Sequence, residues 1–234
     1  MSSLRRFHNH VKNEVIIAAL RNTSSKAPQV LDIGCGRGGD IFKYKKAGVT
    51  HLLGLDPCEA SVEEAAKRSG TISTPNYNFV HMTTPVDFLA DLSDSLDMIT
   101  MFFCVHYLTR ECLRDTLYNA HNALCSKGVV SMVYMEASLV LKHLREWHFK
   151  NDVVTIERTS IDKINVFIKD TAYFERESCE FLVYTEHIRH LCKEIGFDLY
   201  VRPFSEYYVE KEFRMTDHEK VASFMNVSIL LVKI

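Results

Sequence analysis

Residues 30–40 read VLDIGCGRGGD, and this stretch decides the fold of the 234-residue chain. Residues 29–33 form a short, mostly apolar run that predicts a buried β-strand, and the glycines after it predict a tight turn. Residues 38–47 have the pattern of a helix, which Gly48 ends at a position that favours glycine. A strand, a glycine loop and a helix in this order indicate an open α/β sheet that binds a ligand at the carboxyl ends of its strands.

The rest of the chain continues this alternation of apolar runs and amphipathic stretches, as βαβ units around a parallel sheet do. Further strands are predicted at residues 51–56, 77–81, 95–103, 128–135, 197–201 and 227–232. Further helices are predicted at residues 7–20, 61–68, 109–124, 138–149 and 185–195. Antiparallel pairing is expected between residues 153–159 and 164–169. We therefore predict one α/β, Rossmann-like domain over residues 1–234: a mostly parallel seven-stranded sheet, helices on both faces, and a small antiparallel insertion before strand six, within residues 138–184.

The composition is that of a globular protein, with 47% hydrophobic and 25% charged residues. The formal net charge of -2 argues against an extended contact with a nucleic-acid backbone, so any RNA should be contacted through local patches. The seven cysteines form no C-x-x-C pair, which disfavours zinc ribbons and redox motifs and indicates free thiols. No apolar run is long enough to span a bilayer, and residues 1–12 lack the apolar core of a signal peptide.

The glycine loop has the pattern D-x-G-x-G-x-G-G, which begins at Asp32 and continues through Gly34 and Gly36. Glycines lack a β-carbon, so the backbone can approach a ligand closely there. A bare turn and a dinucleotide fingerprint are the alternatives, but the acidic start and the short spacing favour S-adenosylmethionine. Asp56 ends the next predicted strand, where an acid accepts hydrogen bonds from a ribose. Together these features predict an S-adenosylmethionine site, and we expect no metal.

Five segments, in the same order, resemble segments of the messenger-RNA cap guanine-N7 methyltransferases, a family of class I S-adenosylmethionine-dependent enzymes. Residues 4–16, LRRFHNHVKNEVI, are similar to the family's opening R-N-F-N-N-x-x-K segment. Residues 30–46 are similar to its V-L-D-x-G-C-G-x-G-G-D-x-x-K-x-x-K segment, and residues 103–107, FCVHY, to its F-V-C-H-Y segment. Residues 180–184, EFLVY, are similar to P-E-F-L-V-Y, and residues 204–210, FSEYYVE, to F-x-E-F-Y-x-E. Many methyltransferases share the glycine loop, whereas this combination is highly specific.

The resemblance implies two ligand sites. The cofactor would be contacted by Lys12, Asp32, Gly34, Gly36, Asp56, Phe103 and Thr83, the last near the place of the family's usual Asp. The cap would be contacted by Asn9, Arg37, Lys43, Lys46, His106, Tyr107, Glu180 and Tyr208. Considered singly, His106 is more often a packing residue, Glu180 a strand-edge charge and Lys43 part of a solvated helix face. Their occurrence together favours binding.

The implied reaction transfers a methyl group to N7 of the guanosine cap, and its chemistry suits these residue types. Guanine N7 carries a free lone pair at neutral pH, so we expect no general base, only positioning by His106, Tyr107 and Glu180. Proximity and in-line alignment can supply about 7–11 kcal/mol. A carboxylate at Glu180 can accept hydrogen bonds from guanine N1–H and the exocyclic amine, and it favours the positive charge that grows on the base. An aromatic ring beside the base adds about 1–3 kcal/mol of stacking.

The expected partner is the capped 5′ end of mRNA, with other capping-enzyme domains or an activating subunit as further partners, and no membrane. We expect the nucleus for a cellular protein and the host cytoplasm for a protein of a cytoplasmic virus. Two other interpretations stay open. One is a class I methyltransferase with another substrate, and the other is a non-catalytic subunit that binds cap or cofactor and activates a partner.

Overall fold

The main sheet has seven strands in the order β10-β11-β5-β4-β1-β2-β3 in the computed structural model, which describes residues 2–72, 76–169 and 177–234. Its strands are β1 (Gln29–Ile33), β2 (His51–Asp56), β3 (Tyr77–His81), β4 (Leu96–Phe102), β5 (Leu124–Met135), β10 (Phe197–Pro203) and β11 (Asn226–Lys233). The strands from β1 to β5 pair in parallel, whereas β11 is antiparallel to both β5 and β10. The predicted Rossmann-like sheet is therefore confirmed.

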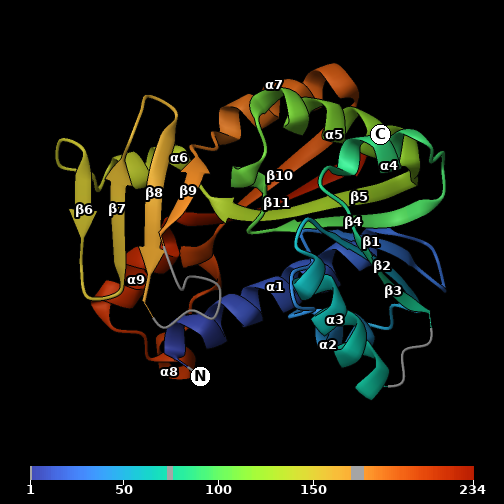
Figure 1. Cartoon of the computed structure of the whole chain (residues 1–234), viewed down its shortest axis with the longest axis horizontal. Helices are drawn as coiled ribbons and strands as arrows, with labels where there is room; N and C mark the ends of the chain where they lie inside the picture. The colour runs from blue at the N-terminus through green and yellow to red at the C-terminus, as the bar shows by residue number, and fades with distance from the viewer. Residues whose placement is uncertain (1, 73–75, 170–176) are drawn as a thin grey trace.

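Helices cover both faces of this sheet, as predicted (Figure 1). One face carries α4 (Pro85–Ala90), α5 (Arg110–Ala123) and α7 (Thr185–Ile195), and the other carries α1 (Ser3–Asn22), α2 (Ile41–Lys46) and α3 (Glu59–Thr71). The alternation of side chains along β5 shows the cause, because Met132 and Tyr134 enter one apolar core while Val129 and Val133 enter the other. Among the described residues, each helix is too short or too polar to cross a bilayer.

The insertion before β10 forms a second, antiparallel sheet in the order β6-β7-β8-β9. The predicted antiparallel pair corresponds to β7 (Val154–Arg158) and β8 (Lys163–Ile168). The short strands β6 (His148–Lys150) and β9 (Ser178–Phe181) extend the pair on either side. Figure 1 shows this sheet beside the main one, so the insertion stands at one flank of the carboxyl-end edge where the glycine loop lies.

The helix predicted for residues 138–149 was wrong. The helix α6 covers only Ala137–Leu141, and β6 occupies the end of the predicted range. Glu146 has a φ of 57°, in the left-handed region, which a right-handed helix cannot include. Arg145 and His148 bond to each other's backbone across this residue and close a turn. The turn lets β6 pair with β7, and this tertiary pairing overrides the helical spacing of the local sequence.

The first helix connects the two halves of the molecule. Its amino end packs against α8 (Glu210–Phe213) and α9 (Asp217–Phe224), which the sequence did not predict. Arg6 Nη2 donates to the backbone carbonyl oxygens of Glu212 and Phe213 at 2.8 and 3.0 Å. Further along α1, Lys12 bonds to the start of α2. Figure 1 shows α1 passing beneath the main sheet from the insertion toward α2, so one helix contacts both flanks of the candidate site.

Candidate functional site

The glycine loop connects β1 to α2 at the carboxyl edge of the main sheet. Gly34, Gly36 and Gly38 have φ of 73°, 52° and 70°, a region that other L-residues rarely adopt. A β-carbon on Gly34 would also lie 2.6 Å from Cβ of Cys104, which follows β4. The loop therefore needs these glycines for its own shape and for close packing, in addition to any approach by a ligand.

Asp56 holds the glycine loop from the end of β2. Its Oδ2 accepts a hydrogen bond from the backbone N–H of Gly36 at 2.8 Å, and its Oδ1 accepts one from Cys58 N–H at 2.9 Å. Each carboxylate oxygen has two lone pairs, so both can accept one more donor. This arrangement fits a ribose, whose two neighbouring hydroxyls can donate to one carboxylate.

Asp32 lies buried under the loop, with 5% of its surface exposed. Its Oδ1 accepts a hydrogen bond from Thr100 Oγ1 at 2.9 Å, and that hydroxyl is also 2.6 Å from the hydroxyl of Tyr44. Burial raises the pKa of Asp32 to about 7, and the nearby Asp40 acts in the same direction. The acid is thus part of a buried polar network that supports the loop from below.

Asp40 joins two of the predicted lysines, and the sequence prediction did not include it. Lys12 Nζ and Lys43 Nζ approach its carboxylate to 2.8 and 2.6 Å. Burial raises the pKa of Asp40, but the two lysines outweigh burial and hold it below its usual value. Lys43 also donates to Gly39 O at 3.2 Å, so its ammonium is engaged within the loop rather than extended into solvent. The spacing of three residues between Asp40 and Lys43 was the available signal.

Phe103 closes the carboxyl end of β4 in a left-handed conformation, with φ 56°. Its N–H donates to Val133 O at 2.8 Å, which anchors the backbone there. Its ring stacks on His8 of α1, with 5.5 Å between centroids and 11° between planes. His8 Nε2 is also 2.9 Å from Ser223 Oγ, and burial lowers the pKa of His8 to about 3, so the ring is neutral. No local sequence pattern predicts this stacked pair.

His106, Tyr107 and Glu180 come together from two distant segments. The first two belong to a 3₁₀ turn, η1 (Val105–Tyr107), and Glu180 belongs to β9. Glu180 Oε1 is 3.6 Å from His106 Nε2 and accepts a hydrogen bond from the Tyr107 hydroxyl at 3.5 Å. Glu180 and His106 are 3% and 5% exposed, whereas Tyr107 is 51% exposed. The structure therefore places these three predicted residues in one cluster, with buried polar groups behind an open aromatic ring.

Among the residues that the structure describes, Glu180 has no fully charged cation beside it. Burial raises the pKa of Glu180 to about 7 and lowers the pKa of His106 to about 4. His106 is consequently neutral at pH 7. Its Nδ1 is buried and has no hydrogen-bond partner among the described residues. Buried polar groups in native proteins are normally paired, so an incompletely satisfied cluster of this kind is expected where a ligand supplies the missing partners.

The other predicted residues lie around these two clusters. Arg37 is exposed at the tip of the glycine loop, and Thr83 is exposed just after β3. Asn9 is half-buried on α1. Lys46 is exposed at the end of α2, where it lines a surface hollow with Phe42. Arg37 and Lys46 are thus accessible to a ligand, whereas contacts with Asp40 and Gly39 hold the Lys43 side chain in the loop.

Tyr208 lies on the far side of α1, where it belongs to an aromatic cluster. Its ring packs edge-on against Phe7, with 5.5 Å between centroids. Its hydroxyl donates to Glu210 Oε2 at 3.0 Å and accepts from Met215 N–H at 3.1 Å. These contacts stabilise the segment that contains α8, and they do not include the residues around Glu180.

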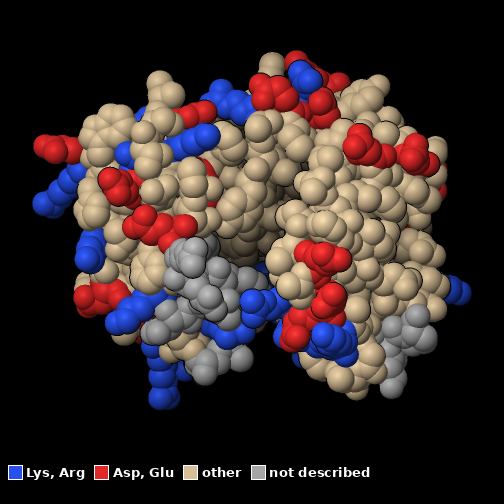
Figure 2. Space-filling view, viewed as in Figure 1, with Lys and Arg blue, Asp and Glu red and all other residues tan. Residues whose placement is uncertain are grey.

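An open hollow separates the insertion from the main sheet, and Lys and Arg side chains gather at its lower end (Figure 2). The insertion borders the hollow through β9, the last strand in its sheet. Just beyond β9, Val183 bridges to Glu136 at the end of β5 and fixes the insertion to the main sheet. The Glu180 cluster therefore combines residues from both sides of the hollow: Glu180 from the insertion, and His106 and Tyr107 from the segment after β4 of the main sheet.

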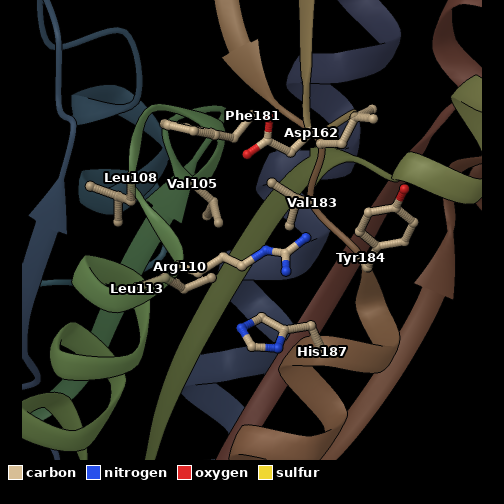
Figure 3. A pocket seen from close by; sticks show the side chains of 10 residues that line it. Val105, Leu108, Arg110, Leu113, Asp162, Phe181, Val183, Tyr184 and His187 are labelled. Atoms are coloured by element: carbon tan, nitrogen blue, oxygen red, sulfur yellow. The ribbon is translucent and has the colours of Figure 1, made fainter. Parts of the chain in front are cut away.

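A second, much smaller hollow of about 30 Å³ lies between η1, α5 and α7. Figure 3 shows Phe181 and Asp162 at one end of it and His187 at the other, with Val105 and Arg110 between them. Its volume corresponds to about one water molecule, whereas small-molecule sites usually enclose about 300–1,000 Å³. This hollow cannot hold a purine base. The open hollow beside β9 is the candidate binding site because the Glu180 cluster borders it.

Comparison with known proteins gives one family. Residues 1–228 match the model described as the mRNA (guanine-N(7))-methyltransferase domain. Among curated relatives, mRNA cap guanine-N(7) methyltransferases are 28% identical in Cryptococcus neoformans (89% of this chain, 37% of that protein) and 30% in Schizosaccharomyces pombe (65% and 46%). The Saccharomyces cerevisiae protein of the same name is 26% identical over 89% of this chain and 54% of its own length. The chain thus spans between about a third and about a half of these relatives.

Solved structures agree on the fold. An S-adenosylmethionine-dependent methyltransferase from Clostridium acetobutylicum has a TM-score of 0.65 and 17% identity, covering 94% of this chain and 90% of that one. Magnesium protoporphyrin IX methyltransferase from Synechocystis with bound SAH has a TM-score of 0.61 and 15% identity, covering 99% and 85%. These similarities establish the class I methyltransferase fold.

Proposed function

Because the chain belongs to the mRNA (guanine-N(7))-methyltransferase family, we propose that it transfers a methyl group from S-adenosylmethionine to N7 of the guanosine cap of mRNA. The observation that carries this proposal is the cluster of His106, Tyr107 and Glu180. Among the described residues, its buried acid has no lysine or arginine partner and its buried histidine has an unpaired nitrogen, and its tyrosine ring is exposed beside them. A guanine would complete this cluster.

The cofactor is proposed to bind at the glycine loop. Asp56 would accept the ribose hydroxyls with the free lone pairs of its two oxygens. The positive φ of Gly34 and Gly36 shapes the backbone that would face the methionine part, and Phe103 would close the end of β4 over it. The remaining predicted contacts are kept as proposals, with supporting roles for Lys12 and Asp32, which hold the loop, and Thr83, which follows β3.

The cap guanine is proposed to bind at the Glu180 cluster. Both oxygens of an ionised Glu180 would accept hydrogen bonds, one from guanine N1–H and one from the exocyclic amine, which adenine cannot reproduce. The exposed ring of Tyr107 would stack on the base, which is worth about 1–3 kcal/mol. Arg37, Lys46 and Asn9 stand as proposed contacts to the cap phosphates, while Lys43 and Tyr208 remain predictions.

The proposed catalysis rests on positioning. When bound, S-adenosylmethionine supplies a methyl group on a positively charged sulfur. The chain has to hold guanine N7 in line with that group and keep water out, and such alignment is worth about 7–11 kcal/mol. The carboxylate of Glu180 also favours the positive charge that grows on guanine, because charge stabilisation is stronger in a buried site. Guanine N7 has a free lone pair, so no proton has to be removed from it.

Because the chain spans only part of its relatives, the activity and partners of the whole protein are part of the proposal. We propose that residues 1–234 form one methyltransferase domain whose substrate is the capped 5′ end of mRNA. Other capping domains or an activating subunit are proposed as further partners. We propose the nucleus as its location, which the eukaryotic origin of the relatives supports, with the host cytoplasm as the alternative for a protein of a cytoplasmic virus.

One assay tests the proposal. The pure protein is incubated with labelled S-adenosylmethionine and RNA that is GpppG-capped, ApppG-capped or uncapped, and the digested RNA is analysed for N7-methylguanosine. We expect product from the guanine-capped RNA and none from the other two. Equal labelling of ApppG-capped RNA would contradict guanine recognition, and labelling of none would favour a non-catalytic subunit or another substrate.

A further inference from the structure

We propose that Ser178 is a positioning residue for guanine recognition, which fixes the Tyr107 ring and the Glu180 carboxylate relative to each other. This inference rests on the proposed function and adds a residue that neither the sequence motifs nor the family comparison assigns. Ser178 opens β9, two residues before Glu180, so both side chains lie on the same face of the strand.

The geometry identifies Ser178 as the main anchor of the tyrosine. Its Oγ is 2.8 Å from the Tyr107 hydroxyl, the usual length of a strong O–H···O hydrogen bond. The bond from that hydroxyl to Glu180 Oε1 is 3.5 Å long, at the outer limit for such a contact. Without the serine hydroxyl, the tyrosine would therefore keep only its weaker polar contact in this cluster.

An anchor is needed because Tyr107 has little packing to hold it. Its side chain is 51% exposed, and it stands on a single 3₁₀ turn. Its ring meets His106 edge-on, with 4.6 Å between centroids. A stacking platform that turns freely loses entropy when the base binds, whereas a fixed ring does not. The serine contributes to binding by reducing this loss.

The same hydroxyl also affects the acid. Burial raises the pKa of Glu180, and the linked hydroxyls of Ser178 and Tyr107, one of which donates to the carboxylate, act against burial. Loss of the serine hydroxyl should therefore move the ionisation of Glu180 to higher pH. A serine that merely filled space on β9 would have no such effect.

The test compares Ser178→Ala, Ser178→Thr and the matched control Cys179→Ala, an exposed neighbour on the opposite face of β9. Steady-state methylation of GpppG-capped RNA is measured from pH 6 to 9, and S-adenosylmethionine and GpppG binding are measured by calorimetry. For Ser178→Ala we expect the KM for RNA to rise about 3- to 10-fold, which is the net effect of one hydrogen bond. We expect kcat within twofold of wild type, unchanged S-adenosylmethionine affinity, and a KM–pH curve displaced to higher pH. Ser178→Thr and Cys179→Ala should behave as wild type.

Each other outcome overturns the inference in a distinguishable way. If wild type methylates the cap and Ser178→Ala shows the same KM and the same pH curve, Ser178 has no positioning role. If Ser178→Thr fails as Ser178→Ala does and both lose S-adenosylmethionine affinity, Ser178 is a packing residue. If wild type neither methylates nor binds GpppG, the proposed function is wrong and the role of Ser178 falls with it.

Discussion

Replacement of the buried acid in Glu180→Gln should lower activity and raise stability together. The side chain keeps its size, but one acceptor oxygen is replaced by an amide NH2 group, a donor that would face a donor of guanine. A hydrogen bond to a charged group contributes about 1.5–3 kcal/mol, so kcat/KM for GpppG-capped RNA should fall about 10- to 150-fold. Binding of S-adenosylmethionine should not change.

The stability gain follows from the pKa of Glu180. Burial raises this pKa from 4.5 to about 7, so the folded protein holds a proton that the unfolded chain releases between these values. The free energy of unfolding therefore falls as pH rises through this window, by about 3 kcal/mol once both states are ionised. Glutamine does not ionise, so the variant should gain stability relative to wild type between about pH 4.5 and 7 and keep the gain above pH 7.

Urea unfolding at pH 5 and pH 8 measures this difference, alongside methylation of capped RNA at pH 8. The control is Glu157→Gln, which changes an exposed acid on β7 of the same small sheet and should alter neither quantity. A Glu180→Gln variant that is less stable than wild type at pH 8 would refute the burial argument. Wild-type kcat/KM in that variant would refute the guanine contact.

Three further predictions concern the candidate site, one at Glu180 and two at the glycine loop. The KM for capped RNA should fall as pH rises through about 7, because only the ionised Glu180 offers two acceptor oxygens, and a pH–KM series with Glu180→Gln as control tests this. Asp40→Asn should destabilise the fold by about 3 kcal/mol in thermal denaturation, because it removes the carboxylate that Lys12 and Lys43 share in a largely buried ion-pair network. Gly34→Ala should cost about 2–4 kcal/mol in urea unfolding, since alanine disfavours φ 73° and its β-carbon would meet Cys104, and an unchanged midpoint would contradict this.

The central elements could be predicted because local and tertiary signals agree there. The bounds of β1 and β2 match the predicted strands, since each apolar run ends at the loop that follows it. The insertion could be predicted only in part. The pair β7 and β8 has its own hydrophobic pattern, whereas β6 has three residues and exists because β7 offers it a free edge. No local pattern specifies a strand of that kind.

Some residues of the candidate site could likewise be predicted from the sequence, and others could not. Asp56 could be predicted from the sequence by its spacing to the glycine loop. Glu180 could be predicted because it is the first residue of the EFLVY segment. Ser178 and His8 could not, because their roles depend on partners 71 and 215 residues away along the chain, Tyr107 and Ser223. Family motifs thus predict the groups that are proposed to touch ligands, whereas only the folded structure shows the groups that hold those side chains.

Asp32 and Glu180 share one electrostatic feature, although they lie in different halves of the site. Each is a buried carboxyl whose pKa burial raises to about 7, one under the cofactor loop and one beside the proposed guanine site. Both therefore stabilise the fold least at and above neutral pH, and for Glu180 this is where the ionised form proposed to bind guanine is most abundant. A ligand that donates hydrogen bonds to such an acid stabilises its ionised form, so binding should lower the pKa and recover part of the lost stability. For Glu180, the free energy of unfolding should consequently increase more on addition of a cap analogue at pH 8 than at pH 6.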